Sequence, residues 1–313
     1  MKNIITNTNR GDKKIVPLDK RLNDRRIKKV ITFDTETAPF YEVVKPYETK
    51  QETMPYSHQV MSGNLEDVIE EINPRTNRVQ YRYMTDTKQK QIIFDFGYVI
   101  GDKQGRVLAK RRFIIREVFL NMDIMKHAHY FEKYPDYIIE LYDRRNVINL
   151  STWVETKAQL EQDIVDYNIT EMYAYNAAFD SRAIRDTHRI ITDGASTFGL
   201  FKDYQIKINC LWGMACETIL QRKKYVEFCK EHGFISESGN IKTSAETVYK
   251  YLLNDPDYVE EHTALEDSII EHHILGECFK AKQKMSFGII SQPWRMVTQW
   301  AKDKGYLESE QQC

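Results

Sequence analysis

Runs of apolar residues along the chain predict four strands. Residues 29–36 begin as a buried strand and end in carboxylates, and residues 91–100 form a second apolar strand. A hairpin turn leads into a third strand over 106–116, and a short strand is predicted at 171–175. The basic residues at 110–112 are typical of a strand at the edge of a sheet, so we expect the third strand to lie there.

Helices are predicted where an N-capping residue precedes apolar residues at helical spacing. Thr152 and Glu155 form a capping box before one helix, and Asn176 suits the N-cap of a second. Thr243 and Thr263 each stand three residues before a glutamate, and they predict two further helix starts. The order of the elements favours an α/β fold with a mixed sheet flanked by helices.

The chain is longer than these elements require, and the surplus falls in separate segments. Residues 41–90 and 117–151 are interpreted as insertions. Both ends of the chain are rich in Lys and Arg, and we interpret them as a solvated arm and a docked amphipathic helix, with nucleic-acid contact as the alternative. The predicted parts are a basic N-terminal arm at 1–27, a main domain at 28–285 that includes both insertions, and a C-terminal tail at 286–313.

Composition excludes several classes of protein but indicates no particular function. The 313 residues carry 45 Lys and Arg against 46 Asp and Glu, and this net charge of −1 argues against a surface that coats nucleic acid throughout. Mean hydropathy is −0.58, and no apolar run is long enough to span a membrane. The polar N-terminus lacks the apolar core of a signal peptide, and five cysteines without framework spacing favour reduced thiols. We therefore expect a cytoplasmic protein without membrane contact.

Four acidic residues and one histidine stand at the ends of the predicted elements. Asp34 and Glu36 are two apart at a strand end, so their side chains point to the same side. Asp180 lies in the first turn of a helix, and His262 and Asp267 flank the start of another. Converging carboxylates require cations, and ligation by oxygen alone suits Mg²⁺ or Mn²⁺. A histidine beside such a cluster is placed to take a proton from water, as in two-metal phosphodiester hydrolysis.

These residues stand in segments that resemble the motifs of a known family. The sequences DTET at 34–37, NAAFD at 176–180 and HTALED at 262–267 resemble the three motifs of the DEDDh 3′–5′ exonuclease superfamily. This group contains the proofreading subunit of bacterial DNA polymerase III. The resemblance covers roughly residues 28–279, apart from the two insertions, and residues 243–275 also resemble phage-encoded members. After the first motif the family's usual Thr-Thr-Gly is replaced by Thr-Ala-Pro, so the chain path there is expected to differ.

The resemblance implies an RNase H-like α/β fold with a mixed five-stranded sheet flanked by helices. It also implies two Mg²⁺ or Mn²⁺ ions and a role for each site residue. Asp34 would bridge the two ions, Glu36 and Asp267 would complete the shell of the first, and Asp180 would act at the second. His262 would be the general base that activates water, and 5′-mononucleotides would be released from a 3′ end. The residues implied to contact substrate are Thr35, Thr37, Asn176 and Phe179, with core packing the alternative for the phenylalanine.

The expected activity is therefore a metal-dependent 3′–5′ exonuclease, with single-stranded DNA as the favoured substrate. An exoribonuclease of the same mechanism is the first alternative, because no residue pattern reads the sugar 2′ position. A polymerase- or replisome-binding module with a vestigial nuclease site is the second. Residues 283–287 weakly resemble the peptide with which proofreading subunits bind the sliding clamp, so a polymerase or a clamp is a possible partner.

Overall fold

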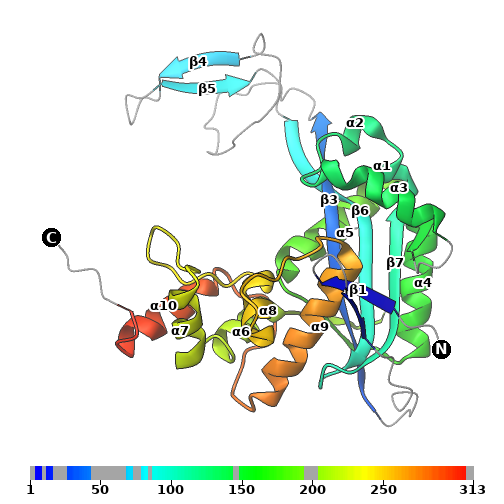
Figure 1. Ribbon diagram of the computed structural model, residues 1–313. Coiled ribbons are helices and arrows are strands. Elements are labelled where there is room, and N and C mark those ends of the chain that lie inside the picture. Colours follow the sequence, from blue (N-terminus) through cyan, green and yellow to red (C-terminus); the bar gives the residue numbers. More distant parts are fainter. Residues whose placement is uncertain are drawn as a thin grey trace. The chain divides into compact units, whose positions relative to one another are not determined.

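The computed structural model describes most of the chain and divides it into two compact units (Figure 1). One unit comprises Met1–Ala38 with Ile92–Cys313, and the other comprises Pro39–Gln91. In the smaller unit, β4 (Val68–Ile72) and β5 (Val79–Tyr83) pair antiparallel. The backbone is described for residues 4–8, 12–16, 27–43, 68–72, 79–83, 87–143, 148–193 and 204–307, and side chains only for 27–40, 89–143, 148–193 and 204–307.

A six-stranded mixed sheet forms the centre of the larger unit, in the order β10-β9-β3-β6-β7-β8. The pairs β10–β9, β9–β3 and β7–β8 are parallel, whereas β6 and β7 pair antiparallel. A separate antiparallel pair, β1 (Ile4–Thr8) with β2 (Asp12–Val16), belongs to the same unit. The sheet strands are β3 (Lys29–Val43), β6 (Thr87–Asp102), β7 (Val107–Ile115), β8 (Ile148–Ser151), β9 (Glu171–Ala174) and β10 (Lys207–Cys210).

The α/β class and the mixed sheet confirm the prediction from sequence, but the sheet has six strands instead of five. Two of the six, β8 and β10, were not located from sequence. Strand β8 lies inside the segment interpreted as the second insertion and pairs with β7 from Arg112↔Ile148 onward. As a result β7 is not at the edge of the sheet, which corrects the interpretation of its basic residues. Lys110 and Arg112 are buried, and Arg112 forms an ion pair with Asp95 inside the protein. A buried arginine paired in this way belongs to the interior and does not protect a sheet edge.

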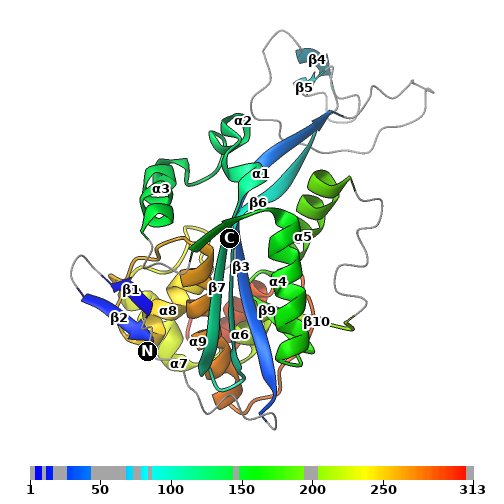
Figure 2. The same ribbon diagram turned by 90° about the vertical axis from the view of Figure 1, so that its right-hand side faces the viewer.

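Helices cover both faces of this sheet (Figure 2). On one face lie α4 (Trp153–Asp166) and α5 (Ala177–Thr192), and on the other lies α9 (Ala264–Lys280) with α6 (Leu211–Glu217) and α8 (Ala245–Leu253). The remaining helical elements are α1 (Arg116–Phe119), α2 (Met122–Met125), η3 (Phe131–Lys133), α3 (Tyr134–Tyr142), α7 (Lys223–Glu231) and α10 (Trp294–Asp303).

The helix starts follow the predicted capping signals in part. Thr152 and Glu155 form the expected capping box before α4. Asn176 and Thr263 occupy the N-cap positions of α5 and α9, although neither side chain makes a capping hydrogen bond. The N-cap of α8 is Ser244, which accepts a hydrogen bond from the backbone N–H of Thr247, and not Thr243 as predicted.

One hydrophobic core cluster lies on the α9 side of the sheet. It combines buried side chains of β9, α6, α7, α8 and α9, and it includes Val297 and Ala301 of α10, which are fully buried. The interpretation of this part of the tail as a docked amphipathic helix is therefore confirmed. Cys210, Cys216, Cys229 and Cys278 are buried free thiols. No helix among the described residues is long and apolar enough to cross a membrane.

Candidate functional site

The two-residue repeat of β3 directs alternate side chains to opposite helices. Thr35 donates a hydrogen bond to Asp180 on α5, with an Oγ1–Oδ1 distance of 2.8 Å. On the other face Thr32 contacts Nδ1 of His272 on α9 at 2.9 Å. Asp34 and Glu36 follow Thr32 at two-residue intervals, so strand geometry points them toward α9. Carboxylate oxygens of Asp34, Glu36 and Asp267 lie within 4.8 Å of one another.

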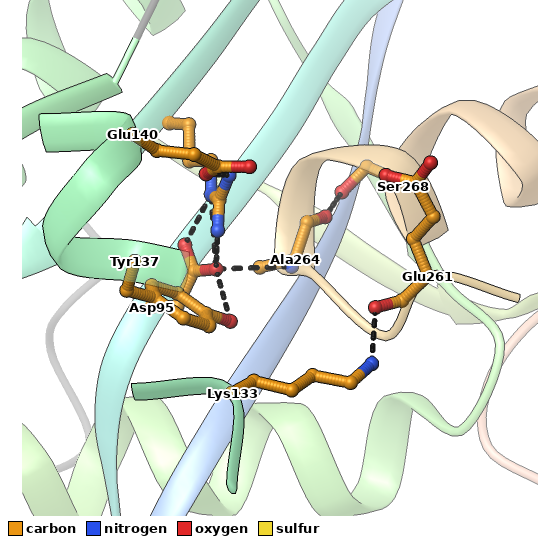
Figure 3. A network of polar contacts seen from close by, with 8 residues as sticks. Asp95, Lys133, Tyr137, Glu140, Glu261, Ala264 and Ser268 are labelled. Carbon is orange, nitrogen blue, oxygen red and sulfur yellow. Dashed lines mark hydrogen bonds and ion pairs between the residues drawn. The ribbon is translucent and has the colours of Figure 1, made fainter. Parts of the chain in front are cut away.

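Close packing of α9 against β6 places Asp267. A Cβ on Gly97 of β6 would lie 2.2 Å from the backbone carbonyl carbon of Ala264, so only glycine permits this approach. Ser268 donates a hydrogen bond to the carbonyl oxygen of Gly97 at 2.9 Å. Asp95, also on β6, accepts the backbone N–H of Ala264 at 3.2 Å (Figure 3). Contacts with β6 therefore determine where α9 begins and how closely it approaches the sheet.

Asp180 enters the site from the opposite face of the sheet. It lies in the first turn of α5, is 3% exposed, and accepts the hydrogen bond from Thr35. The N-terminal end of a helix favours a negative charge at this position. Asp180 raises the pKa of Asp34 by repulsion, so the structure brings all four predicted carboxylates into one electrostatic cluster.

Burial dominates the electrostatics of the cluster. It raises the pKa of Glu36 to about 8 and that of Asp180 to about 7, and the pKa values of Asp34 and Asp267 lie well above their usual range. Repulsion among the neighbouring carboxylates adds to the upward shifts of Asp34, Glu36 and Asp267. Lys133 lowers the pKa of Glu36 but does not cancel its upward shift. Among the described residues, no Lys, Arg or His lies within ion-pair distance of these four groups.

His262 stands immediately before the N-cap of α9, on the loop that leads to Asp267. Its φ of 47° lies in the left-handed region, which a non-glycine residue adopts only when its surroundings hold it there. In the described part of the chain its ion-pair contact is with Glu260, with 3.6 Å between Nδ1 and Oε2. Partial burial is the main cause that lowers the pKa of His262, and the nearby Lys133 lowers it further.

The four residues predicted to contact substrate have different surroundings. Thr35 is buried and engaged with Asp180, so the structure gives it a role in holding that carboxylate. Asn176 is exposed at the N-cap of α5, and its carbonyl oxygen accepts the backbone N–H of Phe179 at 2.7 Å. Phe179 and Thr37 are partly buried. Their contact with substrate stays a prediction.

Three further carboxylates near the site were not identified from sequence. Glu260 repels Asp267 and Asp34, and its own pKa is raised to about 7, chiefly by burial. Glu271 lies one helical turn after Asp267, fully buried, and one of its oxygens lacks a hydrogen-bond partner. Asp95 is fully buried in β6. The signals available were an acid within an otherwise apolar strand for Asp95 and the four-residue helical spacing from Asp267 for Glu271.

The donor set fits hard divalent cations. It consists of carboxylate oxygens, the ligands that Mg²⁺ and Mn²⁺ prefer, and it offers neither thiolate nor imidazole within the three-residue group. Oδ1 of Asp267 is buried without a hydrogen-bond partner, which leaves a lone pair available to a cation. Asp34, Glu36 and Asp267 would hold one ion, and Asp180 would hold a second together with Asp34.

The predicted clamp-binding peptide lies far along the chain from these residues. Residues 283–287 form no helix, and Ser286 donates both its backbone N–H and its hydroxyl to the carboxylate of Glu217. Phe287 is 55% exposed. Binding of a sliding clamp stays a prediction.

Comparisons of sequence yield no match, either to protein-family profiles or to curated proteins. Among solved structures, the chain is similar to cell-death related nuclease 4 (CRN-4), with a TM-score of 0.41 and 11% identity over 83% of this chain and 67% of that one. It is also similar to E. coli exonuclease I in complex with a 5cy-dT13 oligonucleotide, with a TM-score of 0.39 and 11% identity over 82% of this chain and 41% of that one. A third is the Mg²⁺- and Mn²⁺-bound form of S. pombe Pop2p, with a TM-score of 0.39 and 12% identity over 82% and 87% of the two chains. The chain thus spans about two fifths of exonuclease I. At these identities and TM-scores the likeness concerns structure only, and it assigns no activity to this chain.

Proposed function

We propose that this protein is a divalent-metal-dependent 3′–5′ exonuclease that degrades single-stranded DNA to 5′-mononucleotides. The observation that carries the proposal is the cluster of Asp34, Glu36 and Asp267, whose oxygens lie within 4.8 Å of one another in a largely buried site. Buried carboxylates at this spacing repel one another, and their ionisation at neutral pH requires bound cations. Asp180 and His262 complete the set that the sequence motifs predict.

The role of His262 in this proposal is to accept a proton from the attacking water. The Glu260 carboxylate faces Nδ1 and favours the tautomer that carries its proton there, which leaves the lone pair on Nε2. The lowered pKa keeps the imidazole neutral, as a general base requires. When bound, the two cations would supply positive charge that acidifies water and stabilises the developing charge on the phosphate.

The bond changes follow from this arrangement. An oxygen of water forms a bond to the phosphorus of the last phosphodiester, its proton passes to His262, and the bond from phosphorus to the 3′ oxygen breaks. The leaving oxygen takes a proton and becomes the new 3′ hydroxyl of the shortened strand. The released nucleotide keeps the phosphate on its 5′ carbon.

A degradation assay tests this proposal directly. The purified protein is incubated with 5′-labelled DNA and RNA oligonucleotides, each with a free or a blocked 3′ end, in Mg²⁺, Mn²⁺ or EDTA. We expect a ladder that shortens from the free 3′ end of DNA, requires a divalent ion and is absent on blocked DNA. Internal cleavage of the blocked strand would contradict the exonuclease assignment.

The same assay separates the alternatives. Faster degradation of RNA than of DNA would assign the protein to the exoribonucleases that the sequence also allows. Binding of oligonucleotide without hydrolysis in either metal would overturn the enzymatic proposal and favour a binding module with a vestigial site.

A further inference from the structure

The loop that carries His262 is contacted by the segment between β7 and β8. Tyr130 stacks on the imidazole of His262, with ring centroids 4.5 Å apart and planes 11° from parallel. Nζ of Lys133 donates a hydrogen bond to the carbonyl oxygen of Glu261 at 2.5 Å (Figure 3). The same ammonium group lies over the Tyr130 ring, 5.0 Å from its centroid. The side chain and the backbone of the loop are therefore held by two neighbouring residues of one segment.

The same segment is anchored beyond this contact by a buried polar network. Tyr137 donates its hydroxyl to Asp95 at 3.0 Å, and Arg112 joins Asp95 to Glu140 with N–O distances of 2.9 and 2.6 Å. Asp95 also accepts the backbone N–H of Ala264, two residues after His262 (Figure 3). The loop is thus fixed on both sides of His262, by Lys133 before it and by Asp95 after it.

The contacts from Tyr130, Lys133 and Asp95 are important because the backbone conformation at His262 is unfavourable without them. Its φ of 47° is unfavourable for a residue with a Cβ, and burial of its side chain is only partial, at 30% exposure. Without contacts from outside the loop, the imidazole would be free to sample other positions. The stack with Tyr130 restricts its plane, and the bond from Lys133 restricts the backbone at the preceding residue.

We propose that Tyr130, together with Lys133, is a positioning residue that holds the imidazole of His262 in its working orientation. This inference rests on the proposed function for its catalytic consequence. A competing role for Tyr130 would be to stack on a nucleobase of the substrate. The positioning role is favoured because the ring already stacks on His262 and lies beneath the ammonium group of Lys133.

The charged groups around the imidazole give this role a measurable signature. Burial and the charge of Lys133 lower the pKa of His262, and so does the neighbouring His129, whereas Glu246 raises it. The carboxylate of Glu260 faces Nδ1. Removing the Tyr130 ring exposes the imidazole to water, and removing the Lys133 charge relieves repulsion. Both changes favour the protonated form, so both should raise the pKa of His262.

The test combines nuclease kinetics with NMR of ¹³C-labelled histidine in the full-length protein. The variants are Tyr130→Ala, Tyr130→Phe and Lys133→Met, and Tyr142→Ala serves as control because Tyr142 is an 83% exposed aromatic residue of α3. The ring resonances of His262 are identified by their loss in His262→Gln. In the wild type these resonances should show the ring-current shift of a proton above an aromatic face.

We expect Tyr130→Ala to lower kcat about 10–100-fold with little change in KM, the range seen when a supporting residue is removed. The acidic limb of its pH–rate profile should move to higher pH, and the His262 resonances should lose their ring-current shift. Lys133→Met should move the acidic limb in the same direction. Tyr130→Phe should restore most of the activity lost in Tyr130→Ala, since the stack needs the ring and not the hydroxyl.

Several results would overturn the inference. Unchanged His262 resonances in Tyr130→Ala would show that the stack is absent in solution. A kcat equal to that of Tyr142→Ala, or a Phe variant as impaired as the Ala variant, would exclude positioning by the ring. If Tyr130→Ala fails to fold, a pH–rate profile of Lys133→Met whose acidic limb coincides with that of the wild type would refute the positioning role instead. A wild type without nuclease activity would overturn the proposed function, whereas the NMR comparison would still decide the stack.

Discussion

The acidic residues in the middle of β3 are unfavourable individually and are explained only as a group. Asp34 and Glu36 share a face of the strand, and Asp267 meets them from α9. Burial raises the pKa of each of these carboxyl groups, so their ionisation is unfavourable unless a bound cation offsets it. His262, the proposed proton acceptor, is separate from this group, because its ion-pair contact in the described chain is with Glu260.

Two single substitutions should therefore separate metal binding from catalysis. Asp34→Asn is expected to abolish hydrolysis and to weaken Mn²⁺ binding at least about tenfold, since the most central of the proposed ligands loses its charge. His262→Gln is expected to lower kcat about 10²–10⁴-fold, the contribution of a general base, while Mn²⁺ binding stays intact. Isothermal titration with Mn²⁺ and the oligonucleotide assay measure the two effects.

The matched control is Asp136→Asn, which removes the same charge from an exposed position of α3. It should leave both measurements unchanged. Equal loss of Mn²⁺ affinity in the Asp34 and His262 variants would contradict the assignment of metal binding to Asp34 and of proton transfer to His262. Full hydrolysis by either variant would exclude the substituted residue from the mechanism.

At the scale of elements, α9 is positioned by the glycine that it crosses. Gly97→Ala would place a Cβ about 2.2–2.3 Å from three backbone atoms of Ala264 and Leu265, none of which can rotate away. We expect a loss of about 1–3 kcal/mol in unfolding free energy, the usual cost of overpacking, and a larger relative loss of nuclease activity. Activity should suffer because the helix start carries both His262 and Asp267. Urea denaturation and the oligonucleotide assay, done on the same samples, compare the two losses.

Gly213→Ala on α6 is the appropriate comparison. Its added Cβ would meet the terminal methyl group of Ile290 at 2.9 Å, a contact that a side-chain rotation relieves. Because alanine favours a helix interior more than glycine does, we expect this variant to keep its stability and activity. A Gly97→Ala protein as stable and active as Gly213→Ala would show that the close approach of α9 is not required.

The elements whose signals are local were predictable from sequence, and those defined by tertiary contact were not. The start of β3 at Lys29 and the helix start at Thr263 follow from an apolar run and a capping residue. The prediction that this strand ends at Glu36 is wrong, because β3 continues to Val43. Strand β8 has four residues, two of them exposed, and it exists because β7 offers a backbone to pair with. For the same reason the basic residues of β7 were taken for an edge, since the sequence does not reveal that Asp95 lies beside Arg112.

The residues of the candidate site were likewise predictable where their signals are local and not where they depend on tertiary contact. The motifs identify Asp34, Glu36, Asp180, Asp267 and His262 because their spacing and their places at element ends resemble a known pattern. The segment of residues 117–151 was interpreted as an insertion that lies outside the family's motifs. Its Tyr130 lies 132 positions before His262, and the stack between them depends on the path of the intervening chain, which no local pattern encodes.

At the scale of the whole molecule, the net charge of −1 does not reveal that many carboxyl groups are buried together around the site. Buried carboxylates with raised pKa values surround the site, and His272, buried between Thr32 and the carbonyl oxygen of Arg106, has a pKa lowered to about 4. These groups act on stability in opposite directions. Below pH 6.5 protonation of His272 opposes folding, so its contribution to stability rises with pH between about 4 and 6.5.

The buried carboxylates lower the stability of the folded protein as pH rises, and they do so up to a higher pH than His272 acts. The pKa of Glu36 rises from 4.5 to about 8, and that of Asp180 from 3.8 to about 7, so the folded protein binds more protons than the unfolded chain between these values. Stability of the metal-free protein must then fall as pH rises through this range. Between pH 6.5 and 8 the contribution of His272 is already complete, so the carboxylates determine the slope.

We therefore expect the Tm of the protein in EDTA to fall from pH 6.5 to 8, and saturating Mg²⁺ to remove most of that fall. The cation binds the ionised carboxylates of the folded state, and this stabilisation grows with pH as more of them ionise. Glu36→Gln should flatten the slope in EDTA, because it removes a group that titrates in this range, whereas Asp136→Asn should leave it unchanged. Differential scanning calorimetry at several pH values measures all three. A Tm in EDTA that is constant or rises over this interval would mean that the cluster is already neutralised in the metal-free fold, and it would remove the physical reason for expecting a metal there.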